Sequence, residues 1–154
     1  MRFQLAVLVT AALGAVASSA ALAQSPAGYR AQLNSHCRTF TPKFKQIERD
    51  LERAAKAKDL KAVAQALGRG LALNLAQDAY IERVPVPGAM RTQMAPILRL
   101  LRTLDRHARL ALHNATKADG RGFMAEVNEV DRIVPTLNKR LDRAHLRDCG
   151  SNQV

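Results

Sequence analysis

Apolar residues recur at alternating spacings of three and four along most of the chain, which is the pattern of one face of an α-helix. Polar and charged residues fill the positions between them. The pattern predicts four amphipathic helices, whose apolar faces are Phe40, Phe44, Ile47, Leu51 and Ala54; Leu60, Val63, Leu67, Leu71, Leu75 and Ile81; Met94, Ile97, Leu101, Leu104, Ala108, Leu112 and Ala115; and Phe123, Val127, Val130, Val134, Leu137, Leu141 and Ala144.

Short polar segments separate these four stretches. Residues 58–59 and 118–120 predict tight turns, with Asp59 and Asp119 as N-caps of the helices that follow. Residues 84–88 contain two prolines and predict a stiffer link. Because short connections make consecutive helices antiparallel neighbours, we predict an all-α fold, an up-down-up-down four-helix bundle.

Three prolines fall within or at the edge of the helical patterns. We expect Pro42 at the first position of a helix, after a short extra N-terminal helix at residues 30–38. Pro96 is expected to restart a helix after a loose turn at residues 90–95. Pro135 interrupts an unbroken apolar pattern and is expected to kink its helix without ending it.

The first 23 residues predict a cleavable signal peptide. Arg2 supplies a basic start, residues 3–16 are mostly apolar, and small residues precede an expected cleavage after Ala23. The apolar run is too short for a retained transmembrane helix. We therefore expect residues 24–154 to form a single helical-bundle domain without a transmembrane segment, secreted or held in the cell envelope.

The chain has two cysteines, Cys37 and Cys149, near the two ends of the predicted mature domain. An exported chain with an even number of cysteines favours a disulfide over free thiols or a metal site. In the predicted topology the first helix begins, and the last helix ends, at the same end of the bundle. We therefore predict that a Cys37–Cys149 bond closes the fold.

Three segments resemble small exported helical proteins of high-GC actinobacteria that carry one N-terminal and one C-terminal cysteine. They are Asn-Ser-His-Cys at 34–37, Pro-Ile-Leu-Arg-Leu-Leu at 96–101 and His-Leu-Arg-Asp-Cys at 145–149. The resemblance supports the bundle and its two cysteines. It implies no activity and no ligand, since those proteins have no assigned function.

Composition adds a strong positive charge, with 24 Lys and Arg against 13 Asp and Glu and a formal net charge of +11. Such a field attracts polyanions. Few aromatic residues are available to stack on bases, which argues against nucleic acid as a partner. The candidate partners are anionic envelope polymers, such as teichoic acid or acidic polysaccharide, and lipid head groups.

A basic strip, defined as Arg99, Arg102, Arg106 and Arg109, lies along one face of the third predicted helix, away from its apolar face. Guanidinium groups match phosphate and carboxylate geometry, so the strip is the candidate anion-binding surface. The alternative is an ordinary solvated face, in which Asp105 shields two of the arginines.

Polar residues also occur on the apolar faces. Asn74 and Asp78 share a face with the leucines of the second helix, and His145 continues the apolar face of the fourth. We expect His36, Asn74, Asp78 and His145 to converge at the disulfide end, with two methionines, Met90 and Met94, nearby. Such a polar cluster could be a ligand site for haem or copper. Alternatively, Asp78 pairs with an arginine or caps the 84–88 link, and Asn74 fixes helix register.

No common catalytic or cofactor motif occurs in the sequence. Cys-x-x-Cys-His, His-Glu-x-x-His, Glu-x-x-His, Gly-x-Ser-x-Gly and a glycine-rich phosphate loop are all missing. Secreted chorismate mutases, similar in outline only, carry cations inside a bundle, whereas Lys and Arg lie outside the apolar faces here. The sequence predicts an exported non-enzymatic protein with no catalytic residue, cofactor or metal. A small haem- or metal-binding bundle is the alternative, followed by a secreted all-helical enzyme.

Overall fold

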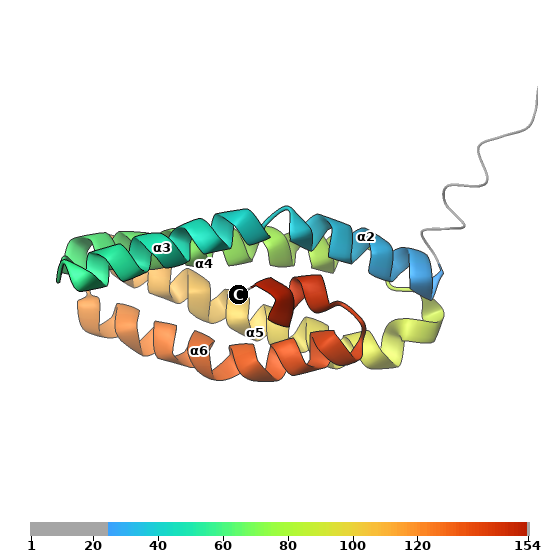
Figure 1. Ribbon diagram of the computed structural model, residues 1–154. Helices are drawn as coiled ribbons and strands as arrows, with labels where there is room; N and C mark the ends of the chain where they lie inside the picture. The colour runs from blue at the N-terminus through green and yellow to red at the C-terminus, as the bar shows by residue number, and fades with distance from the viewer. Residues whose placement is uncertain (1–24, 154) are drawn as a thin grey trace, which may run out of the picture.

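The computed structural model describes residues 25–153, and this part of the chain is helical with no strand (Figure 1). The predicted signal peptide, residues 1–23, lies outside the described residues. The all-α prediction is confirmed. The helices are α2 (Pro26–Arg38), α3 (Thr41–Lys56), α4 (Leu60–Arg83), α5 (Arg91–Thr116) and α6 (Gly120–Arg143), with short 3₁₀ turns η1 (Gly88–Met90), η2 (Arg147–Cys149) and η3 (Ser151–Gln153).

Local capping chemistry sets the starts of two long helices. Asp59 Oδ1 accepts a hydrogen bond from the Ala62 amide at 3.0 Å, and Asp119 Oδ1 accepts one from the Gly122 amide at 2.9 Å. Each aspartate satisfies an amide in the first turn that has no partner within the helix. Both aspartates are therefore N-caps, as predicted, at the starts of α4 and α6.

The prolines depart from the sequence prediction most clearly at Pro96. Helix α5 begins at Arg91 and contains Pro96, so the expected loose turn at 90–95 and restart at Pro96 are wrong. Pro96 removes one hydrogen bond, to the Thr92 carbonyl, close to the start of the helix. Met90 and Met94 are fully buried one turn apart, and their packing holds this turn helical. Pro135 lies inside an α6 that continues to Arg143.

Helix α2 begins earlier than residues 30–38, because Ser25 caps it: Ser25 Oγ accepts a hydrogen bond from the Gly28 amide at 3.0 Å. Helix α3 begins at Thr41, one residue before Pro42. The proline is still within the first turn, where its missing N–H costs nothing.

The core is built from aliphatic side chains on the faces that the pattern predicted. Ile97, Leu101, Leu104 and Leu141 are buried, and α5 packs along α6 and α4. Leu60 was expected in this core, but 81 % of its surface is exposed. It is the first residue of α4, directly after the Asp59 cap.

The chain turns back on itself after α6. His145 adopts a left-handed conformation, with φ of 59°, and directs η2 against α2. Cys37 and Cys149 are joined by a disulfide with Cα atoms 5.0 Å apart, which confirms that prediction. Asn34 spans the same contact, donating to the His145 carbonyl at 2.9 Å and accepting from the Asp148 amide at 3.2 Å.

Across residues 25–153, we find no helix with both the length and the apolar character needed to cross a membrane.

Candidate functional site

A small cavity of about 180 Å³ lies inside the bundle beside the disulfide. Polar side chains from α4 and α6 face it, namely Asn74, Gln77, Asp78 and Asn138. Leucines of α5 and α6 form much of the remaining wall, and Cys149 and Gly150 close one side. Burying polar groups in an apolar core costs free energy unless they are hydrogen-bonded. The hydrogen-bond partners and the protonation state of Asp78 therefore determine the character of this cavity.

Asp78 is buried and forms a hydrogen bond with the carboxyl group of Asp105, which comes from α5. Burial raises the pKa of Asp78 well above its ordinary value. The negative charge of Asp105, the hydrogen bond to it and the charge of Glu82 act in the same direction. Asp78 is therefore protonated at pH values where an exposed aspartate is charged.

Asp105 is the accepting partner in this acid pair. The pKa of Asp105 is also raised, chiefly by burial; the hydrogen bond from Asp78 and the positive charge of Arg109 lower it, and the negative charge of Glu82 raises it further. Its Oδ1 atom is buried, and no amide, hydroxyl or ammonium group of the described residues donates to it. A shared proton lets the two carboxyl groups lie together with one negative charge instead of two. Asp78 thus pairs with a carboxyl group and not with the expected arginine or the 84–88 link.

The basic strip lies on the outer face of α5, and all four of its arginines are exposed. Arg102 forms an ion pair with Glu82 of α4, with 3.1 Å between Nε and Oε1. A shallow hollow of about 350 Å³ is bordered by Arg102, Asp105, Arg106, Arg109 and Leu110. Asp105 therefore contacts both the basic strip and the inner cavity. It lines the hollow of the strip, and it accepts a hydrogen bond from Asp78, which lines the cavity.

The predicted polar cluster divides into two parts. Asn74 and Asp78 line the same cavity, but His36 and His145 do not. His36 stacks on Tyr80 of α4, with ring centroids 3.5 Å apart, and His145 is exposed in the turn after α6. Within residues 25–153, no group of three or more His, Cys, Asp and Glu side chains is arranged to hold a metal ion.

His36 has a distinct environment of its own. Burial lowers its pKa, and the positive charge of Lys43 lowers it further. Its Nε2 atom is buried without a hydrogen-bond partner in the described part of the chain. The ring is therefore a neutral stacking element that joins α2 to α4.

Sequence reasoning missed Gln77, which is buried beside Asp78. Its position, four residues before the buried Ile81, was the available signal. It also missed a contact between α5 and α6, in which His107 Nδ1 lies 2.6 Å from Glu126 Oε2. Glu126 follows Phe123 by three residues and so borders the apolar face of its helix, a position that indicates a partly buried carboxylate.

No protein-family model, curated protein or solved structure matches this chain.

Proposed function

We propose that this chain is an exported, non-enzymatic helical protein that binds anionic envelope components through the basic strip of α5. The ligand chemistry is a phosphate- or carboxylate-bearing polymer or a lipid head group. The observation that carries the proposal is the hollow in which Arg102, Arg106 and Arg109 border one exposed depression. Three guanidinium groups around one depression can donate to several oxygens of the same anionic group.

The negative charges near the strip are too few to neutralise it. Glu82 pairs with Arg102, and Asp105 is the other carboxylate at the hollow. The carboxyl group of Asp105 is turned toward Asp78, with which it shares a proton. Asp105 still interacts with Arg109, but with Glu82 it supplies only two negative charges beside the four arginines of the strip, so the positive potential over the hollow persists.

We also infer that α3, α4, α5 and α6 form an up-down-up-down bundle, to which α2 is a short N-terminal addition. Supporting this arrangement, α3 packs against α4, α4 against α5 and α5 against α6, and short turns join the first and last of these pairs (Figure 1).

Export after cleavage at Ala23 belongs to the same proposal. It is supported by the disulfide, because such bonds persist in oxidising compartments.

Replacing Arg99, Arg102, Arg106 and Arg109 together by glutamine is expected to weaken binding to anionic partners without unfolding the protein. All four side chains are exposed, so the core loses no packing. Exposed charge pairs contribute roughly 0.2–1 kcal/mol each, so the variant should bind about four- to a thousandfold more weakly. Binding can be measured by sedimentation with teichoic acid and, separately, with phosphatidylglycerol vesicles, at low and high salt. The two ligands distinguish a polymer from a lipid surface.

A matched control removes the same charge elsewhere. Arg121, Arg132, Arg140 and Arg143 are exposed on α6, and their replacement by glutamine lowers the net charge equally. We expect this variant to retain most of the binding. Equal losses in the two quadruple variants would show that total charge, and not the strip, determines binding. No binding by the wild-type protein to either ligand at low salt would also overturn the proposal.

A further inference from the structure

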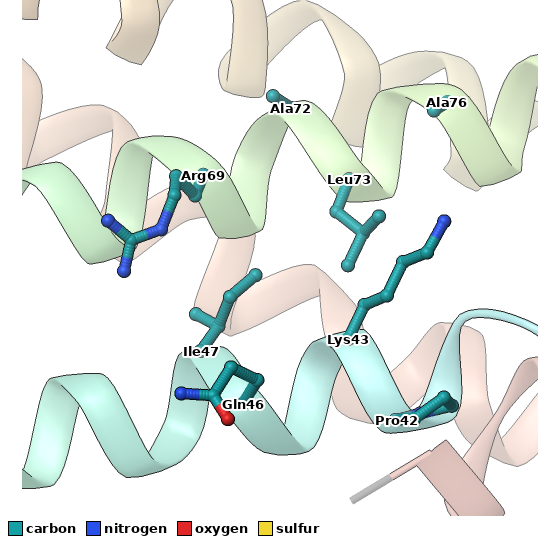
Figure 2. A pocket seen from close by; sticks show the side chains of 8 residues that line it. All are labelled: Pro42, Lys43, Gln46, Ile47, Arg69, Ala72, Leu73 and Ala76. Carbon is teal, nitrogen blue, oxygen red and sulfur yellow. The ribbon is translucent and has the colours of Figure 1, made fainter.

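An open groove of about 600 Å³ runs between α3 and α4, on a different part of the molecule from the basic strip (Figure 2). Its walls come from one face of each helix. Helix α3 contributes Pro42, Lys43, Gln46 and Ile47, and helix α4 contributes Arg69, Ala72, Leu73 and Ala76. Volumes of this size are typical of small-molecule sites, which lie between about 300 and 1,000 Å³.

Small side chains open this groove. Ala72 and Ala76 are one turn apart on α4 and contribute only methyl groups at its far edge, while Leu73 points toward α3 (Figure 2). Ile47 and Leu73 are half-buried at the junction of the two helices and supply branched apolar surface. The result is an open apolar channel on the outside of a highly charged protein.

Two cations border the apolar channel toward its opposite ends (Figure 2). Arg69 is paired with Asp50, with 2.8 Å between Nη2 and Oδ2. Lys43 lies with its ammonium 5.2 Å from the centroid of the Phe40 ring, and it takes part in none of the ion pairs between described residues. One end of the channel therefore offers a cation that a ligand carboxylate can pair with.

From this arrangement we infer that the groove binds a single acyl chain with an anionic head group, as in a long-chain fatty acid. The hydrocarbon chain lies along Ile47 and Leu73, and the carboxylate pairs with Lys43. The segment from Arg69 to Ala76 spans about 10 Å of helix, so the channel holds roughly half of an extended sixteen-carbon chain, and the rest of the chain lies beyond it on the surface. A second copy of this chain fits the groove poorly, because two molecules with a formal net charge of +11 repel each other. The inference does not depend on the strip.

The test uses a fluorescent polyene fatty acid that is displaced from the protein by palmitate, decanoate or the neutral cetyl alcohol. We expect palmitate and decanoate both to displace the probe, because each chain is long enough to fill a channel of about 10 Å. Ala76→Phe fills the channel at an exposed position and should weaken palmitate binding by at least about tenfold while the circular dichroism is unchanged. Ala72→Phe is a second blocking variant, and Ala64→Phe, at an exposed alanine of α4 outside the groove, is the matched control.

Charge and shape are separated by one further substitution. Lys43→Gln should weaken palmitate binding by roughly three- to tenfold and leave cetyl alcohol unaffected, since only the fatty acid carries a carboxylate. Equal affinity of wild-type, Ala72→Phe and Ala76→Phe proteins for palmitate would overturn the inference. The inference would also be overturned if Ala64→Phe lost as much palmitate binding as the blocking variants. It would be overturned as well if palmitate and cetyl alcohol bound with equal affinity and Lys43→Gln had no effect.

Discussion

Removing the Cys37–Cys149 bond is expected to lower the free energy of unfolding by about 2–5 kcal/mol while most of the helices remain formed. The bond joins residues separated by 112 positions, so it restricts nearly the whole described chain in its unfolded state. The native apolar contacts of α5 with α6 do not involve the bond and should keep those helices paired. The measurement is denaturant unfolding of the oxidised protein and of the Cys37→Ser, Cys149→Ser double variant, monitored by circular dichroism.

Asn34→Ala serves as the control, because it breaks hydrogen bonds across the same contact and leaves the disulfide intact. Each such bond contributes about 0.5–1.5 kcal/mol, so the loss of both should cost about 1–3 kcal/mol, against about 2–5 kcal/mol for the double cysteine variant. A loss below about 1 kcal/mol on removing the disulfide would mean that contacts in the folded state, and not the loop constraint, hold the C-terminal turn against α2.

The helices were predictable because the signals that form them are local. Apolar spacing identified the faces of α5 and α6. Asp59 and Asp119 indicated two helix starts, because their side chains accept hydrogen bonds from amides three residues away. Pro96 shows the limit of such signals. A proline normally ends a helix, but the burial of Met90 and Met94 against other helices keeps this turn helical, and that packing is not visible in a local pattern.

The site was less predictable, because it depends on how each helix is rotated about its axis. Placing residues at one end of the bundle does not make their side chains face the same space. Asn74 and Asp78 do line one cavity. His36 instead lies at the contact between α2 and α4, where it stacks on Tyr80. The pairing of Asp78 with Asp105 joins two like-charged residues from separate helices, which sequence rules count as repulsive.

Asp78→Asn is expected to remove a loss of stability that the wild-type protein suffers as the pH rises. The raised pKa of Asp78 means that the folded state holds a proton that the unfolded state, with an ordinary aspartate, releases. This stabilisation is complete below the unfolded pKa of about 3.9 and is lost as the pH rises through the folded pKa, with a slope of up to about 1.4 kcal/mol per pH unit. Asparagine stays neutral and can still donate to Asp105. The variant should therefore become the more stable protein in alkaline solution.

The measurement is urea unfolding of both proteins at several pH values between about 5 and 9, where the difference between the two stabilities isolates this proton. Asp105→Asn separates the two causes of the shift. Burial is the largest cause at Asp78, so in this variant stability should still fall with the same slope, over a pH range that ends lower because the neighbouring charge is gone. A difference in stability between wild type and Asp78→Asn that does not vary with pH would exclude the shared proton.

If the proton is present, its loss places a second negative charge under the arginines of α5. Binding of polyanions should therefore also weaken in alkaline solution, and Asp78→Asn should resist that change.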